Sequence, residues 1–343
     1  MSSHLEIDAP FEATILGLLR RQFTKPKPLP ATIRLTGETA IITGSNVGLG
    51  FEACRQLLSR GLSQLIMGVR SQVKGEAAAN RLRQEFPNTS ISVWIVDMES
   101  YDSIQTFANQ CHTLERIDIV VLNAGLMKTS YMTAAATGHE VMMQVNYLST
   151  ALLAILVLPI LKSKKTIGAN RPPVLSIVGS DLAYTAKLER QGPVLRQFDT
   201  SRDFSHFEWY GKSKLMLIFF IARLAEMVSP SDVLINMSNP GATKGTDFGR
   251  DTNLIFRKAF SVLQFFLSRT VAEGASMYLD AALTRGTDSH GSFISEWTIK
   301  PYPKIWYTPE GRETDLILWE ETLGELDFAG ARQILKDMRG NAS

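Results

Sequence analysis

The 343-residue chain has 36 basic and 34 acidic residues, giving a formal net charge of +2, and 45% of its residues are hydrophobic. This composition supports a large core and leaves no excess of cations for binding a nucleic-acid backbone, so nucleic acid is not an expected partner. Cys54 and Cys111 are the only cysteines, and their separation is typical of a reducing compartment without disulfides or a metal motif. We therefore expect two inert core thiols and no metal site.

The first residues predict an extension rather than a targeting segment. Met1 to Pro10 contains no apolar run after a basic start, so no secretory signal is expected and a cytoplasmic location is the default. Residues 1–35 contain a short amphipathic piece, Phe11 to Phe23, and then a Pro-rich connector. We expect one folded domain over residues 36–343.

Short β-rich runs alternate with helical patterns along the rest of the chain. Each run is separated from the next by enough residues for a crossover helix, which indicates a parallel sheet. The pattern predicts an α/β fold with a single Rossmann-type, doubly wound parallel sheet and helices on both faces. The predicted strands are Thr39–Thr43, Leu65–Val69, Ile91–Val96, Ile117–Leu122, Val174–Val178, Val233–Met237 and Ser292–Ile294.

Two further segments are predicted to be helical. The apolar stretch Val145–Leu161 is interrupted by polar residues and Pro159, and it is too short for a transmembrane span, so we expect a buried helix. The charged tail after Pro301 predicts surface helices around Leu316–Leu326.

A glycine-rich loop follows the first strand and runs directly into a helix. Gly44 permits a tight turn, Gly48 allows the backbone to approach a pyrophosphate, and Gly50 allows close packing of helix on strand. The remaining candidate contacts to the cofactor in this loop are Ser45, Asn46 and Leu49. An ordinary strand-to-helix turn is the alternative explanation.

The end of the second strand predicts which cofactor is bound. Arg70 stands where NAD-binding sites usually place an acid, and a guanidinium suits the 2′-phosphate of NADP(H). Lys74, one helical turn further, is a second candidate cation. Both residues are also compatible with a solvated helix start.

The third and fourth strands end in further candidate cofactor residues. Asp97 and Met98 follow the third strand, where Asp97 is expected either to bind adenine or to cap the helix that begins near Tyr101. Asn123, Ala124 and Gly125 follow the fourth strand and are expected to flank a ribose.

Four motifs occur in a recognisable order: Thr43-Gly-x-x-x-Gly-x-Gly50, Asn123-Ala-Gly125, Ser180, and Tyr210-x-x-x-Lys214. Over about residues 36 to 300 the chain resembles the short-chain dehydrogenase/reductase family. Val145-Asn-Tyr-Leu148 and Pro240-Gly241 resemble its retinol-dehydrogenase-like and fungal secondary-metabolism branches. The resemblance implies an oxidoreductase that transfers hydride between NADP(H) and a carbonyl or alcohol.

The candidate catalytic residues are Tyr210, Lys214, Ser180 and Asn146. On a helix, Tyr210 and Lys214 lie one turn apart on one face, so an ammonium can stabilise a phenolate; a packed Tyr beside a surface Lys is the alternative. The resemblance implies that Tyr210 exchanges a proton with the substrate oxygen, that Lys214 also binds the nicotinamide ribose, and that Ser180 polarises the carbonyl. It also implies that Asn146 binds a relay water, although a satisfied core amide explains Asn146 equally well.

The sequence departs from the family pattern at three places. Gly179 replaces a common serine, and residues 181–209 form an insertion expected to border the substrate, with Tyr184, Arg190, Arg196, His206 and Trp209. After Pro240 and Gly241, both cofactor candidates, the loop is one residue longer, so either Thr243 or Thr246 is expected to meet the nicotinamide. His206 is expected to tune substrate binding or to cap a helix.

An amphipathic apolar segment within residues 243–270 predicts a substrate lid that faces the 181–209 insertion. Core packing, a dimer contact and a membrane-surface helix are the alternatives. Homo-oligomerisation and weak membrane association through residues 1–35 or 252–268 therefore stay open.

Reduction of a ketone or aldehyde of a hydrophobic small molecule is the predicted activity. An isomerase, dehydratase or cyclase on the same scaffold is the first alternative. A cofactor-sensing protein is the second, although a sensor needs neither Tyr210 nor Lys214. Fold and motifs do not identify the substrate.

Overall fold

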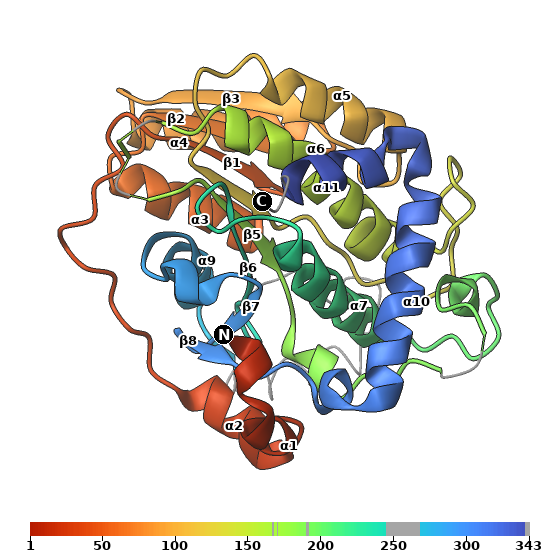
Figure 1. Cartoon of the computed structure of the whole chain (residues 1–343). Helices are drawn as coiled ribbons and strands as arrows, with labels where there is room; N and C mark the ends of the chain where they lie inside the picture. Colours follow the sequence, from red (N-terminus) through yellow and green to blue (C-terminus); the bar gives the residue numbers. More distant parts are fainter. Residues whose placement is uncertain (167, 170, 190–191, 245–267, 340–343) are drawn as a thin grey trace.

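The computed structural model describes residues 1–166, 168–169, 171–189, 192–244 and 268–339. Within these residues one eight-stranded sheet has the order β3-β2-β1-β4-β5-β6-β7-β8 (Figure 1). The strands are β1 (Thr39–Thr43), β2 (Gln64–Val69), β3 (Ser90–Ile95), β4 (Ile119–Leu122), β5 (Val174–Val178), β6 (Leu234–Asn239), β7 (Ser292–Ser295) and β8 (Thr298–Lys300).

The sheet is parallel from β3 to β7, and β8 pairs antiparallel with β7. The central strands β1, β4, β5 and β6 are buried at every position, as expected for parallel strands covered on both faces. The chain builds β1, β2 and β3 toward one edge and then returns to place β4 beside β1. Open α/β sheets bind their ligands at such a change of direction, so a ligand is expected at the carboxyl ends of β1 and β4.

Helices cover both faces of the sheet, which confirms the predicted doubly wound Rossmann-type architecture (Figure 1). On one face, α3, α4 and α9 share a core cluster with Ala40 and Ile42 of β1; on the other, α5, α6 and α7 share a core cluster with Ile41. In the second layer α10 packs on α7, and α11 packs on α6. These helices are α3 (Gly48–Ser59), α4 (Gln72–Glu85), α5 (Tyr101–Cys111), α6 (Ser149–Ser163), α7 (His206–Glu226), α9 (Val271–Leu283), α10 (Pro309–Glu325) and α11 (Ala331–Arg339).

The apolar helix predicted at Val145–Leu161 begins as a π-helix, Met143–Leu148, and continues as α6. In the described part of the chain it is the one helix whose length and composition would suit a membrane span, and 89% of its most apolar window is buried inside the protein. It is therefore a core helix. Both cysteines are also buried.

The β7–β8 hairpin was not predicted. Glu296 and Trp297 form its two-residue turn with φ of 50° and 54°. Such turns usually carry Asn or Gly, so the sequence contained no turn signal. Trp297 is nevertheless fully buried, and its indole N–H donates to Ser276 Oγ at 3.2 Å. Packing therefore fixes a backbone conformation that the local sequence disfavours.

The N-terminal segment folds back onto this edge of the sheet (Figure 1). It contains α1 (Ala9–Glu12) and α2 (Ile15–Phe23), and the Thr14 hydroxyl caps α2 by accepting from the Gly17 N–H at 3.0 Å. Ser2 is fully buried: its N–H donates to Ser292 Oγ, and its hydroxyl accepts from the Phe293 N–H. The segment is thus held to β7 by specific hydrogen bonds.

Candidate active site

The glycine-rich loop adopts a geometry that fits a pyrophosphate. Gly44 and Gly48 have φ of 65° and 59°, a region that favours glycine. A Cβ at Gly50 would lie 2.5 Å from the Gly44 oxygen, whereas a Cβ at Gly48 would meet no atom within 4 Å. Helix α3 begins after Val47 without a side-chain cap. Open space and the uncapped N–H groups of α3 therefore meet where a phosphate would bind.

Asn123 holds this loop in place. Its side-chain amide donates to the Thr43 and Gly44 oxygens at 2.9 and 3.1 Å, and its oxygen accepts from the Tyr278 hydroxyl at 3.0 Å. The Thr43 hydroxyl in turn accepts from the N–H groups of Asn123 and Ala124. Asn123 thus joins the ends of β1 and β4.

Arg70 lies at the end of β2, with its side chain 67% exposed, and pairs with Glu99 at 2.9 Å. Lys74 is exposed in the first turn of α4, where its N–H donates to the capping Ser71 hydroxyl. A 2′-phosphate at Arg70 would have to compete with Glu99. Residues 68–74 contain no acid, so the local sequence showed no sign of this carboxylate, which reaches Arg70 from the end of the neighbouring strand β3.

Asp97 does not cap the following helix, so that alternative was wrong. Ser100 caps α5 instead, accepting from the Ser103 N–H at 3.3 Å. The Asp97 carboxylate accepts from the Glu99 N–H at 3.0 Å, which shapes the turn after β3. Met98 is buried, and its carbonyl accepts from the Ser149 hydroxyl.

Tyr210 and Lys214 are both buried on α7, close to Ser180 at the end of β5. The Lys214 Nζ lies 5.7 Å from the centroid of the Tyr210 ring and donates to the Val178 oxygen at 2.8 Å. Burial lowers the pKa of Lys214 to about 8. Burial also raises the pKa of Tyr210; a hydrogen bond with Ser180 offsets part of the rise, and the Asp181 carboxylate adds to it. Tyr210 is therefore a protonated phenol at neutral pH.

Asn146 lies in the π-helix and makes three hydrogen bonds. Its oxygen accepts from the Leu126 N–H, and its amide donates to the Leu126 oxygen and to Ser213 Oγ. A Cβ at Gly125 would lie 3.2 Å from the Asn146 oxygen and 3.6 Å from Lys214 Nζ. Asn146 thus fixes the loop after β4 against α7, next to Lys214.

The structure explains the glycine that precedes Ser180. A Cβ at Gly179 would lie 2.6 Å from Met237 Sδ and 2.9 Å from the Phe293 ring. Neighbouring side chains therefore disfavour the serine that the family pattern has at Gly179. Ser180 itself is partly exposed, and its hydroxyl accepts from the Leu182 N–H at 3.3 Å.

The loop after β6 brings Pro240, Gly241 and Thr243 to the same edge of the sheet. Gly241 has a φ of 71°, and Thr243 pairs with Arg269 in a parallel bridge. A Cβ at Gly274 would lie 2.7 Å from both Thr243 Oγ1 and Leu49 Cδ2, so this part of α9 packs against both residues. Thr246 and most of the predicted lid, residues 245–267, lie outside the described residues.

The insertion at 181–209 is partly core. Trp209 stacks edge-on against Tyr131, Phe198 and Phe204, and Tyr184 is buried with its hydroxyl donating to the Pro301 oxygen. His206 is the first residue of α7, and Ser205 occupies the N-cap position. Arg196 follows Leu195 in a short 3-10 helix, and Arg190 lies outside the described residues.

Comparison with known proteins decides the family. The family model described as short chain dehydrogenase matches residues 38–169. Short chain dehydrogenase virL from Hypocrea virens is 61% identical over 339 residues, which cover 99% of each chain. Short chain dehydrogenase/reductase mfmJ from Annulohypoxylon moriforme is 46% identical over 326 residues, 94% of each.

The chain belongs to the short-chain dehydrogenase/reductase family.

Solved structures of this family share the fold. An NADPH-bound short chain oxidoreductase from Pseudomonas aeruginosa has a TM-score of 0.55 at 21% identity, covering 76% of this chain and 95% of that one. L-sorbose reductase from Gluconobacter frateurii, solved with NADPH and L-sorbose, has a TM-score of 0.58 at 17% identity, covering 77% and 97%. Almost the whole of each neighbour is matched, whereas about a quarter of this dehydrogenase/reductase lies outside the match.

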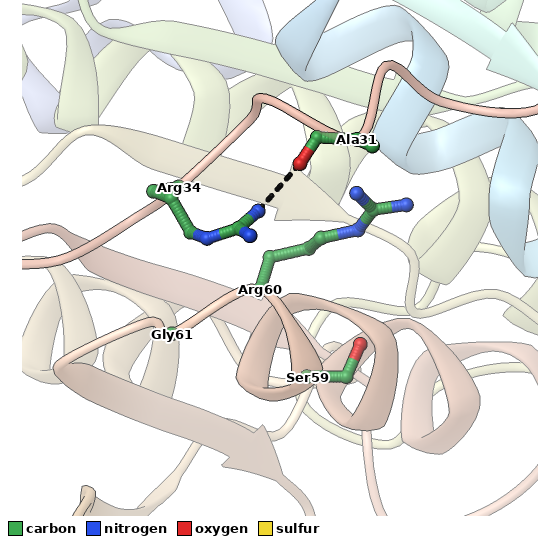
Figure 2. Close-up of a pocket in the computed structure, with 5 residues that line it drawn as sticks. All are labelled: Ala31, Arg34, Ser59, Arg60 and Gly61. Atoms are coloured by element: carbon green, nitrogen blue, oxygen red, sulfur yellow. Dashed lines mark hydrogen bonds between the residues drawn. The ribbon is translucent and has the colours of Figure 1, made fainter.

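A surface hollow is lined by Ala31, Arg34, Ser59, Arg60 and Gly61 (Figure 2). It lies where α3 ends and β2 is about to begin, at the amino ends of the strands and therefore opposite the family's active-site edge. Arg34 and Arg60 donate to the backbone oxygens of Ala31 and Pro30. The hollow thus contains none of the candidate catalytic residues. Among the described residues no cluster of His, Cys, Asp and Glu could hold a metal ion.

Proposed function

We propose that this protein is an NADP(H)-dependent reductase of a ketone or aldehyde carried by a hydrophobic small molecule of the secondary-metabolite type. The observation that carries the proposal is the position of Tyr210: its phenol is buried, hydrogen-bonds with Ser180 and lies next to Lys214 on α7, at the ligand-binding edge of the sheet. A protonated phenol is the form needed to donate a proton to a carbonyl that is being reduced.

Each of these side chains has a separate role in the proposed reduction. NADPH supplies the hydride when bound, and Gly44, Gly48 and the first turn of α3 would hold its pyrophosphate. Ser180 donates a hydrogen bond to the substrate oxygen and so stabilises the charge that develops there. Tyr210 then transfers its proton to that oxygen. Lys214, with a pKa of about 8, is mostly cationic at pH 7 and stabilises the phenolate that remains.

Arg70 supports the choice of NADP(H) over NAD(H), because its guanidinium lies at the end of β2, where it can pair with a 2′-phosphate. The solved neighbours lend support, since several were determined with NADP or NADPH. The remaining cofactor contacts of the proposal are Ser45, Asn46, Leu49, Lys74, Asp97, Met98, Ala124, Gly125, Pro240, Gly241 and Thr243. A cytoplasmic location, the lid at 243–270 and self-association also belong to the proposal.

The test is consumption of NADPH, followed by absorbance, across a panel of polyketide, terpenoid and retinoid carbonyls. Tyr210→Phe removes one hydroxyl and leaves the ring packed, so we expect turnover to fall by about 10²-fold or more with NADPH binding retained. Turnover near that of the wild type would contradict Tyr210 as the proton donor. A product formed without NADPH consumption would instead favour an isomerase, dehydratase or cyclase.

A further inference from the structure

The N-terminal segment contacts both loops that frame the catalytic edge of the sheet. The Gln22 side chain exchanges two hydrogen bonds with the backbone of Ala242, in the loop after β6. One residue earlier, Arg21 Nε lies 3.5 Å from a carboxylate oxygen of Asp181, in the loop after β5. Asp181 directly follows Ser180. Helix α2 therefore bridges the two loops that carry Ser180 and Thr243.

Arg21 belongs to a buried cluster of six charges, which we call the N-terminal ion cluster. Its cations are Arg21, Arg269 and Lys300, and its acids are Glu12, Asp181 and Glu296, so the formal charges balance. The contacts are Arg21 to Glu12 at 2.5 Å, Glu12 to Lys300 at 2.9 Å, Lys300 to Glu296 at 3.2 Å and Glu296 to Arg269 at 3.8 Å. Arg269 also donates to the Arg21 carbonyl, and the Arg21 guanidinium lies 4.7 Å from the centroid of the Tyr184 ring.

This cluster reaches the reaction centre through Asp181. The carboxylate of Asp181 disfavours the phenolate of Tyr210, as described above. Among the described contacts, the Ser180 hydroxyl, the Lys214 ammonium and the neighbouring phenol of Tyr278 also act on the Tyr210 phenol. Asp181 in turn interacts with Arg21, Arg269 and Tyr184. Arg21 is the cation paired with it directly.

We propose that Arg21 is a positioning residue of the active site: its pairing with Asp181 fixes the turn that carries Ser180 and neutralises a carboxylate that would otherwise oppose proton loss from Tyr210. The inference rests on the proposed function. The N-terminal segment thus helps to position the residues at the catalytic edge.

The pH profile of the reverse reaction tests this. Alcohol oxidation with NADP⁺ requires Tyr210 as the phenolate, so the apparent pKa in kcat/KM reports on the charge near its hydroxyl. In Arg21→Met the unpaired carboxylate of Asp181 should raise that apparent pKa by about one unit. Adding Asp181→Asn removes the carboxylate and should return the profile to the wild-type position. Arg21→Lys keeps the charge and should stay close to the wild type.

Arg223→Met is the matched control. Arg223 lies on α7, the helix of Tyr210, and pairs with buried Asp315 at 2.6 Å, so its loss should lower thermal stability similarly and leave the pH profile unchanged. If Arg21→Met does not fold, Asp181→Asn alone should lower the apparent pKa. An unchanged profile in Arg21→Met or in Asp181→Asn alone would overturn the inference, as would a shift in Arg21→Met that adding Asp181→Asn does not reverse. Full activity of Tyr210→Phe would instead contradict the proposed function itself.

Amide exchange gives a readout that needs no substrate. The N–H groups of Leu182 and Ala183 donate to the Ser180 hydroxyl and carbonyl. In Arg21→Met they should exchange at least about tenfold faster, because the turn loses its anchor, while Arg223→Met should leave them unchanged. Unchanged exchange in Arg21→Met would contradict the positioning of this turn.

Discussion

Arg70 shows how a single residue depends on a neighbour that is distant in sequence. Its guanidinium is exposed and already paired with Glu99. An exposed pair of this kind contributes only about 0.2–1 kcal/mol, so a doubly charged phosphate can displace the carboxylate. If Arg70 binds the 2′-phosphate as proposed, Glu99 competes with that phosphate and weakens NADPH binding.

We expect Glu99→Gln to tighten NADPH binding by about two- to fivefold, since it removes that competition. Arg70→Ala should weaken NADPH about tenfold or more and leave NADH nearly unchanged. Titration of both cofactors by fluorescence measures the two effects. In an Arg70→Ala background Glu99→Gln should give a smaller gain, and equal changes for NADH and NADPH would contradict this account of Arg70.

Gly179 gives a prediction about packing. Gly179→Ala places a methyl group against Met237 and Phe293, and overpacking of this kind costs about 1–3 kcal/mol. Gly324→Ala in α10 is the control, because a Cβ there meets no atom within 4 Å and alanine favours a helix by up to about 1 kcal/mol. Thermal unfolding should show the first variant less stable than the wild type and the second at least as stable.

At the scale of elements, hydrophobic patterning predicted the seven parallel strands, with ends shifted by up to two residues. The strand β8 was not predicted because its turn, Glu296-Trp297, contains neither Gly nor Asn and is held by tertiary packing. The contacts of Glu99, Asp181 and Arg21 were not predicted for a related reason. Each acts on a residue of a different element, and such pairings follow from the sheet order rather than from local spacing.

Helix α9 begins with a capping box that satisfies backbone N–H groups at its N-terminus. The Thr270 hydroxyl accepts from the Glu273 N–H, and the Glu273 carboxylate accepts from the Thr270 N–H at 2.8 Å. Thr270→Ala should reduce the free energy of unfolding by about 1 kcal/mol in chemical denaturation. Glu273→Gln keeps an acceptor and should cost less; an equal or larger loss would contradict the capping role.

At the scale of the whole molecule, one buried carboxyl makes stability depend on pH. Burial raises the pKa of Glu140 to about 7, from an ordinary value of 4.5, although the N–H groups of Met142 and Met143 offset part of the rise. The folded protein therefore binds this proton more tightly than the unfolded chain does. Its contribution to stability is present below pH 4.5 and is lost as the pH rises to about 7.

Glu140→Gln should consequently raise the melting temperature at pH 8 and have little effect at pH 4.5. The loss of unfolding free energy between pH 4.5 and pH 8 should be about 3 kcal/mol smaller than in the wild type. Melting curves at both pH values measure it. Asp337→Asn, at an exposed site in α11, is the control and should leave the pH dependence unchanged.

The hydrogen bonds between Ser2 and β7 join residues about 290 positions apart. A ribosome adds about 5–20 residues per second, so the first residues wait roughly 15–60 s before their partners are synthesised. During that time Lys300 and Arg269 have not yet been synthesised, so Glu12 and Arg21 lack these partners and the N-terminal ion cluster cannot form. The nascent chain can therefore assemble its cofactor half early, while its catalytic edge is completed only as synthesis ends.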